Sequence, residues 1–158
     1  MFTVKIKSVN LNEAALVQNC AFDAFEDDSN KYGSYPPNIE SMDWICAEID
    51  KGNFYKVLYG GAFAGGLCVE LDADKILDIK YVFLGQQFQD KKIGSQVMGL
   101  IEKQFGEAVA FKLLTPSGSL RNHHFYEKQG YIKTRVFNPI ADDDDFSVFE
   151  YVKRVGAK

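Results

Sequence analysis

Hydrophobic and polar positions in the first part of the chain follow two different periods. Residues 2–8 alternate apolar with polar side chains, the period of a strand with one buried face. Apolar residues then recur every three or four positions, as on one side of a helix, at Val17, Cys20, Ala21, Ala24 and Phe25. Asn12 is suited to cap the start of this helix. Residues 26–38 are polar and acidic, then rich in Gly and Pro, which predicts a loop.

The middle of the chain predicts one more helix followed by three strands. One side of this helix is apolar, with Met42, Ile45, Cys46 and Ile49, and Gly52 is placed to end it. The period then changes to that of strands at residues 54–59 and 62–71, which flank Gly60 and Gly61, a pair suited to a tight hairpin turn. A third strand is expected over residues 76–85.

The last part alternates between helices and strands. A long amphipathic helix is indicated by Ile93, Val97, Leu100, Ile101 and Phe105. We expect a strand at 109–115, a helix at 119–129, and strands at 131–137 and 146–154. An antiparallel meander followed by a βαβ unit implies a mixed sheet with helices on both faces. We therefore predict an α/β (α+β) fold with a mostly antiparallel central sheet, in a single domain covering residues 1–158.

Composition narrows the classes of function. The 158 residues are 46% hydrophobic and 25% charged, the balance of a folded protein. A net charge of −4 argues against binding to nucleic acid, and no apolar run is long enough to span a membrane. Three widely spaced cysteines and a strand-like start without a signal peptide favour the cytoplasm. The adjacent His123 and His124 point in different directions on a helix, so we expect no metal.

The strongest local signal is the turn between the third strand of the meander and the long helix. It reads Gln-Asp-Lys-Lys-Ile-Gly-Ser over residues 89–95. Unpaired N–H groups and the positive end of the dipole make a helix start suitable for a pyrophosphate. Gly94 would permit close approach of the backbone, and Lys91 and Lys92 add positive charge. The alternative is an ordinary helix start near Lys91, with Asp90 as its N-cap and two solvated lysines.

Two segments together resemble the GNAT superfamily of N-acetyltransferases. Gln89 and Gly94 match the family's acetyl-CoA loop, in which Gln or Arg is followed by two residues, Gly, one residue, and Gly or Ala; Lys92 stands in the place of the first glycine. The segment Phe-Tyr-Glu-Lys-Gln-Gly-Tyr at 125–131 is similar to the family's second hallmark. The order of elements is also that of the family. The resemblance therefore covers essentially the whole chain and implies a GNAT-like fold.

The resemblance implies acetyl-CoA as co-substrate, bound mainly through the backbone. Main-chain groups of Val82, Phe83 and Leu84 would pair with the pantetheine arm as an added strand. The pyrophosphate would be held by the helix start, at Gln89, Asp90, Lys91, Lys92, Ile93, Gly94 and Ser95. Lys92 is compatible with this role if its backbone is helical, because a helical residue need not be glycine. Tyr126 and either Ser119 or Asn122 would contact the cofactor from the second segment.

The reaction implied is direct transfer of the acetyl group to a primary amine. Tyr126 would protonate the departing thiolate, a role that suits a weakly acidic phenol, although a helix tyrosine packed on the sheet is the alternative. An ammonium must first lose a proton, so a carboxylate is needed as base. Asp78 stands where some family members carry a catalytic glutamate, and Glu70 is the other candidate. Either one is equally compatible with a surface position at a strand end.

The acceptor is expected to be an amine of a small molecule or peptide. The acidic and aromatic segment that contains Asp28, Tyr32 and Tyr35 would border its site, and the run Asp142–Asp145 adds further negative charge; both are equally typical of solvated turns. A second hypothesis is a non-catalytic module that binds acyl-CoA as a sensor or partners another protein. We expect no nucleic-acid or membrane partner. We expect the chain to be a monomer or a homodimer.

Overall fold

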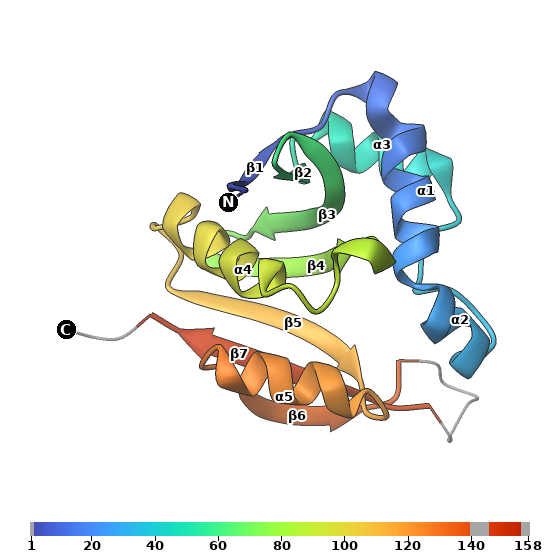
Figure 1. Ribbon diagram of the computed structural model, residues 1–158. Coiled ribbons are helices and arrows are strands. Elements are labelled where there is room, and N and C mark those ends of the chain that lie inside the picture. The colour runs from blue at the N-terminus through green and yellow to red at the C-terminus, as the bar shows by residue number, and fades with distance from the viewer. Residues whose placement is uncertain (1, 140–145, 156–158) are drawn as a thin grey trace. The chain divides into compact units, whose positions relative to one another are not determined.

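Seven strands form one mixed sheet in the described residues, 2–139 and 146–155 of the computed structural model. The run Asp142–Asp145 lies outside these ranges, so the prediction made for it is not addressed. The strand order is β1-β2-β3-β4-β5-β7-β6 (Figure 1). The strands are β1 (Val4–Ser8), β2 (Phe54–Tyr59), β3 (Ala62–Leu71), β4 (Ile76–Leu84), β5 (Ala110–Pro116), β6 (Ile132–Phe137) and β7 (Val148–Arg154).

Five α-helices and two short 3-10 helices connect the strands in the same described ranges. The α-helices are α1 (Ala14–Ala24), α2 (Glu26–Tyr32), α3 (Met42–Asp50), α4 (Ile93–Gln104) and α5 (Leu120–Lys128); the 3-10 helices are η1 (Leu11–Glu13) and η2 (Gln86–Phe88). β4 and β5 pair in parallel, whereas β1–β2, β2–β3, β5–β7 and β6–β7 are antiparallel. The predicted mixed, mostly antiparallel α/β fold is therefore confirmed.

The chain divides into two compact units, which are described separately. The first unit comprises Met1–Val69 and Tyr81–Gln104, and the second comprises Glu70–Lys80 and Phe105–Lys158. Because β3 and β4 each run through the boundary, both units contain parts of both strands. The description as one domain covering residues 1–158 stays a prediction.

The core of the first unit lies between its helices and the strands. Packed together are residues from α1, α3 and three strands, among them Val17, Ile45, Phe54, Cys68 and Phe83. Six successive residues of β3, from Ala64 to Val69, are all buried, which requires cover on both faces of the strand. Cys68 belongs to the cluster with α1 and α3, and α4 buries Ile93, Val97, Met98 and Ile101. The first unit is thus a layered structure rather than a one-sided sheet.

The second unit contains α5 and the strands β5, β7 and β6. β7 lies between β5 and β6, with Leu113 opposite Tyr151 and Ile132 opposite Val152 (Figure 1). The helix is followed by Gly130, whose φ of +96° is the left-handed conformation that glycine adopts after a helix. The amide of Tyr131 donates to the carbonyl of Tyr126 at 3.0 Å, which completes this helix end.

The hairpin and most helix positions agree with the sequence prediction. β2 and β3 have the predicted bounds, and both Gly60 (φ +57°) and Gly61 (φ +84°) are left-handed, as a primed hairpin turn requires. The predicted cap Asn12 is wrong, because it lies inside η1. The cap is Asn10, whose amide donates to the Glu13 carboxylate at 3.0 Å in a capping box.

The prediction of a loop over residues 26–38 is also wrong in its first half. Glu26–Tyr32 form α2, which carries three acidic residues in its first turn and Lys31 in its last. This charge order favours a helix by interaction with its dipole. The helix ends at Gly33, which has a φ of +83° and donates its amide to Ser29. The absence of an apolar stripe concealed this helix from the periodicity of the sequence.

Candidate active site

A β-bulge in the first hairpin positions the segment that follows β4. Val57 pairs with Gly65 and Leu58 pairs with Phe63, so Ala64 is an extra residue in β3. The carbonyl of Ala64 accepts a hydrogen bond of 2.9 Å from the amide of Gly85, the residue directly after β4. The chain therefore leaves the sheet at a point defined by the bulge.

Gln89 closes the turn that follows. Its side-chain Nε2 donates to the carbonyl of Leu84 at 2.9 Å, and the amide of Phe88 donates to the carbonyl of Gly85 at 2.8 Å. The ring of Phe88 packs edge-on against Tyr59 of β2, with 6.2 Å between centroids. The glutamine of the motif thus fixes the end of β4, and its side chain lies within the turn itself.

The backbone between Gln89 and α4 is left-handed at two residues that are not glycine. Asp90 has a φ of +61° and Lys92 a φ of +64°. The expectation that Lys92 sits on a helical backbone is therefore wrong, and Asp90 is not the N-cap of a helix starting at Lys91. The helix α4 begins at the buried Ile93. Glycine would fit the left-handed backbone at Lys92 without strain, as in the family motif.

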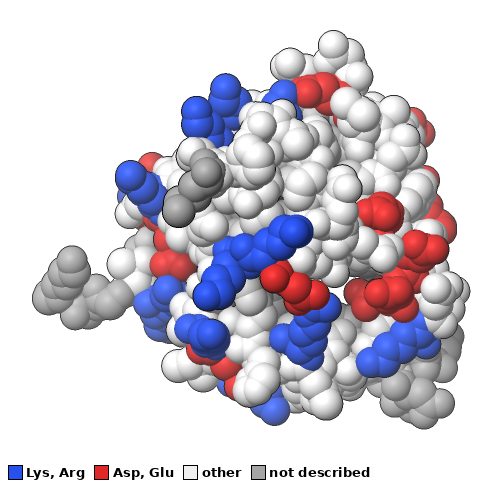
Figure 2. All heavy atoms as spheres, in the orientation of Figure 1, with Lys and Arg blue, Asp and Glu red and all other residues white. Residues whose placement is uncertain are grey.

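Charge around this turn is positive at the lysines and negative at α2. Lys91 and Lys92 are exposed just before the first turn of α4, where the helix N–H groups lack intrahelical partners. Acidic side chains gather on the side of the molecule where α2 lies (Figure 2), which carries Glu26, Asp27 and Asp28 in its first turn. The helix start therefore combines amide donors with two ammonium groups.

The predicted acceptor residues occupy α2 and the segment after it. Asp28 is half-buried, and its pKa is raised mainly by the loss of solvent. Tyr32 lies under the ammonium of Lys31, with 5.2 Å from the nitrogen to the ring centroid. Tyr35 packs on Phe22 of α1 with ring centroids 4.8 Å apart. These three residues belong to the first unit, as do Val82–Leu84 and Gln89–Ser95.

Tyr126 belongs to an aromatic cluster in the second unit. Its ring is half-buried and lies 6.0 Å from Tyr131 and 6.1 Å from Tyr151, between centroids. Burial raises the pKa of Tyr126 to about 12. The phenol therefore keeps its proton at any physiological pH. The hydroxyl of Tyr151 donates to Glu127 at 2.7 Å, which ties this part of α5 to β7.

The start of α5 contains the two alternative cofactor contacts. Asn122 donates from Nδ2 to the buried Thr115 hydroxyl at 3.2 Å, so one end of its amide is engaged with β5. Ser119 is the N-cap residue of α5, and its carbonyl accepts from the amide of His123.

His123 has a packing role. Its Nε2 lies 3.0 Å from the carbonyl of Pro116, and its ring stacks on Phe149 with 4.6 Å between centroids. Among residues 2–139 and 146–155, no three His, Cys, Asp or Glu side chains gather in a group that could hold a metal. In those same ranges, no helix is both long and apolar enough to cross a membrane.

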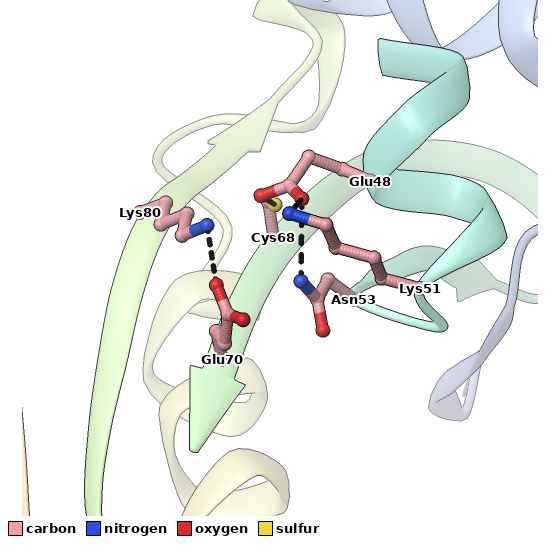
Figure 3. A network of polar contacts seen from close by, with 6 residues as sticks. All are labelled: Glu48, Lys51, Asn53, Cys68, Glu70 and Lys80. Atoms are coloured by element: carbon pink, nitrogen blue, oxygen red, sulfur yellow. Dashed lines mark hydrogen bonds and ion pairs between the residues drawn. The ribbon is translucent and has the colours of Figure 1, made fainter. Parts of the chain in front are cut away.

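The two candidate bases have different surroundings in the second unit. Glu70 forms an ion pair with Lys80, 2.7 Å between Oε1 and Nζ (Figure 3). Asp78 pairs in register with Lys112 on β5, and its pKa is raised, mainly because burial disfavours the charged form. A raised pKa makes a carboxylate a stronger base.

Sequence reasoning missed a buried carboxylate in the first unit. Glu48 of α3 is 1% exposed; its Oε1 lies 3.8 Å from the thiol of Cys68, and its Oε2 lies 3.4 Å from Asn53 Nδ2 and 3.2 Å from Lys51 Nζ (Figure 3). A buried charge requires such partners. Its position on the apolar side of α3, between Ile45 and Ile49, was the available signal.

A family model identifies the class of protein to which this site belongs. The model of the acetyltransferase (GNAT) family matches residues 17–131. The match covers more than half of the 158 residues and includes both the turn before α4 and Tyr126. The chain therefore belongs to the GNAT family of acetyltransferases, and by class it is an acyltransferase. No curated protein matches the sequence significantly.

Solved structures share the fold across nearly the whole chain. The PaiA N-acetyltransferase of Thermoplasma acidophilum, solved with coenzyme A, has a TM-score of 0.75 and 16% identity, covering 97% of this chain and 99% of that chain. The ribosomal-protein-S18-alanine N-acetyltransferase of Escherichia coli has a TM-score of 0.78 and 9% identity, covering 99% of this chain and 96% of that chain. Arabidopsis thaliana Naa50, in complex with the bisubstrate analogue CoA-Ac-MVNAL, has a TM-score of 0.73 and 13% identity, covering 96% of this chain and 99% of that chain. At these identities the likeness shows the fold.

Proposed function

We propose that this protein transfers the acetyl group of acetyl-CoA to a primary amine of a small molecule or peptide. The observation that carries the proposal is the turn from Leu84 to Ile93, in which Gln89 secures the end of β4 and two lysines stand at the start of α4. Family membership supports acetyl transfer. The neighbours solved with coenzyme A or a CoA-peptide analogue support the donor and an amine acceptor.

The residues of the turn fit the chemistry of a CoA pyrophosphate. Left-handed residues such as Asp90 and Lys92 occur in backbone nests, which direct N–H groups toward an anion. Together with the amides of Ile93, Gly94 and Ser95 at the helix start, they would hold the phosphates. The ammonium groups of Lys91 and Lys92 would add charge-assisted hydrogen bonds. The carboxylate of Asp90 would have to point away from the ligand.

The pantetheine arm fits the second half of β4. Parallel pairing with β5 runs from Ile76 to Asp78 in β4, and the strand continues beyond that register to Leu84. We propose that main-chain groups of Val82, Phe83 and Leu84 pair with the pantetheine amides, as in an added strand. The carbonyl of Leu84 accepts from Gln89, and we assign the amide of Leu84 to the ligand.

When bound, acetyl-CoA supplies an activated thioester. Asp78, or Glu70 in its place, would take a proton from the ammonium of the acceptor, so that the neutral amine attacks the acyl carbon. The amide of Leu84 would donate to the oxygen that becomes negative. Tyr126 would give its phenolic proton to the departing sulfur. The phenol carries this proton at neutral pH.

The acceptor would lie against α2 and the segment after it. Asp28 supplies a carboxylate, and Tyr32 and Tyr35 supply aromatic faces, a combination that attracts an ammonium group. Cytoplasmic location, a monomeric or homodimeric state and the absence of nucleic-acid and membrane partners remain part of the proposal, as does the contact of Ser119 or Asn122 with CoA.

A thiol-release assay with acetyl-CoA and a panel of amines tests the proposal. We expect turnover with at least one amine. We expect Tyr126→Phe to slow it about 100-fold, the usual effect of losing a general acid, which is much more than it weakens CoA binding. The alternative is a CoA sensor without catalysis, which the strained Lys92 in place of glycine favours. CoA binding without thiol release on any amine would select that alternative, and equal turnover in Tyr126→Phe would remove Tyr126 from the acid role.

A further inference from the structure

The junction between α1 and α2 is a single residue. α1 ends at Ala24, α2 begins at Glu26, and Phe25 lies between them. The ring of Phe25 packs against Tyr81 and Phe83 of β4, with centroids 6.2 Å and 5.7 Å apart. This contact fixes the junction on the sheet but leaves the direction of α2 to other interactions.

Gln86 supplies those interactions from the turn after β4. Its amide donates to Asp23 Oδ2 at 2.8 Å, and its side-chain Nε2 donates both to the carbonyl of Asp23 at 2.9 Å and to Glu26 Oε2 at 3.0 Å. We call Asp23, Glu26 and Gln86 the junction clamp. One side chain thus satisfies a carbonyl in the last turn of α1 and holds a carboxylate in the first turn of α2. Two of the three bonds are to charged groups, which are the stronger kind.

The helix α2 is short and has no fully buried side. It is seven residues long, and none of its side chains is fully buried. A helix of that length is not stable in isolation, and without buried apolar area it gains little from packing. Its two ends are held by Gly33 at the C-terminus and by the junction clamp at the N-terminus.

Gln86 of the junction clamp belongs to the same segment as the turn before α4. Gln86 begins η2, and Gln89, directly after η2, bonds to Leu84. Four consecutive residues thus connect the start of α2 with the backbone that leads into Asp90 and Lys92. A ligand that restrains this turn also restrains Gln86, because the amide of Gln89 donates to the carbonyl of Gln86 at 3.3 Å across η2.

We propose that Gln86 is a positioning residue that couples the CoA turn to α2, so that CoA bound before α4 stabilises the helix that borders the acceptor. This inference rests on the proposed function, since it takes the turn as the CoA site and α2 as the acceptor wall. Coupling of this kind is reciprocal: an acceptor that binds against ordered α2 strengthens CoA binding by the same factor.

Hydrogen exchange followed by mass spectrometry tests the coupling with CoA as the probe and needs no knowledge of the acceptor. In the wild type, CoA slows exchange both in residues 86–95 and in α2. Gln86→Glu keeps the shape of the side chain but replaces its N–H donor with an oxygen facing Asp23 and Glu26. Gln87→Glu is the matched control, because Gln87 is a neighbouring exposed glutamine and the change adds the same charge to the same turn.

The expected result is that CoA protects residues 89–95 in all three proteins but protects α2 only in the wild type and Gln87→Glu. Exchange in α2 of Gln86→Glu is expected to be at least about tenfold faster, because the substitution removes both Nε2 bonds, one of them to the charged Glu26. CoA protection of α2 that persists in Gln86→Glu, or is lost equally in Gln87→Glu, overturns the coupling. Failure of CoA to protect residues 89–95 of the wild type instead overturns the proposed function.

Discussion

The side chain of Gln89 donates a 2.9 Å hydrogen bond to the carbonyl oxygen of Leu84, across the turn that joins β4 to α4. This bond holds the last residue of β4 in place relative to the residues that lead into the helix. It gives the motif glutamine an intramolecular function that is independent of any direct contact with a ligand.

Replacing Gln89 with Leu removes this bond at nearly constant volume. We expect the free energy of unfolding to fall by about 1 kcal/mol, the typical net value of one hydrogen bond. We also expect weaker CoA binding, because the turn loses its preorganised shape. Urea unfolding and calorimetric titration with CoA measure the two effects. Unchanged affinity in a destabilised variant would restrict Gln89 to a role in folding.

The left-handed backbone of Lys92 predicts a stabilising substitution. A residue with a Cβ loses about 1–2 kcal/mol of stability in this conformation. Glycine avoids this strain, and its greater entropy in the unfolded chain lowers stability by about 0.5–1 kcal/mol. We expect Lys92→Gly to be more stable than Lys92→Ala, which has the same loss of charge but keeps the strain. Thermal unfolding of the pair measures the difference. Equal stability would show that the backbone at Lys92 is not strained.

The same two variants separate charge from conformation in ligand binding. Both lack the ammonium group, so both should bind CoA less tightly than the wild type at low salt, and the difference should shrink as salt rises. A salt dependence identical to that of the wild type would mean that Lys92 makes no electrostatic contribution to CoA binding.

Two glycines of β3 make room for Phe83 of β4. A Cβ on Gly65 would overlap with the carbonyl oxygen of Phe83, and a Cβ on Gly66 would lie 2.7 Å from the tip of the Phe83 ring. We expect Gly65→Ala to destabilise the protein by about 2–3 kcal/mol through overpacking. Gly99→Ala in α4 is the control, because its Cβ meets nothing within 4 Å and alanine favours a helix by about 0.5–1 kcal/mol. A tolerated Gly65→Ala in urea unfolding would contradict this packing.

Asp78 should show opposite effects on activity and stability. Burial raises its pKa above 3.8, so the folded state holds this proton to a higher pH than the unfolded state does. The contribution of Asp78 to stability is therefore full below 3.8 and is lost as pH rises through the raised pKa. We expect Asp78→Asn to be more stable than the wild type at neutral pH, with no such gain below 3.8.

In the thiol-release assay, Asp78→Asn should slow turnover about 100-fold if Asp78 is the base. Glu70→Gln is the comparison, since it removes the other candidate and its ion pair with Lys80. A large loss in Glu70→Gln alone would transfer the role of base to Glu70.

Strong periodic patterns were sufficient to predict most of the fold. The apolar positions from Met42 to Ile49 predicted α3, because the buried side of a helix is apolar at regular spacing. Gly60 and Gly61 predicted the first hairpin, because its turn requires left-handed residues. The helix α2 has no apolar stripe, and Gln86, which bonds to Glu26 in its first turn, lies sixty residues further along the chain. Short polar helices stabilised by distant partners are not visible in a local pattern.

The candidate site was predictable in its position but not in its conformation. The spacing of Gln89 and Gly94 located the turn. The left-handed backbone of Asp90 and Lys92 could not be predicted, because this conformation is uncommon for residues other than glycine.

Two features outside the site had a signal in the sequence. The capping box of Asn10 with Glu13 was recognisable, because the two residues have the required spacing. The carboxylate of Glu48 was recognisable only by its place among apolar neighbours on α3.

Calorimetric titration of CoA into the wild type, Gly94→Glu and Gly99→Glu tests most directly whether the start of α4 binds CoA. The two variants place the same carboxylate on the same helix, but only Gly94 lies in its first turn. Our account predicts saturable binding to the wild type and to Gly99→Glu, and none to Gly94→Glu, because bulk and negative charge would occupy the pyrophosphate position. Unchanged affinity of Gly94→Glu, or no binding by the wild type, would contradict it.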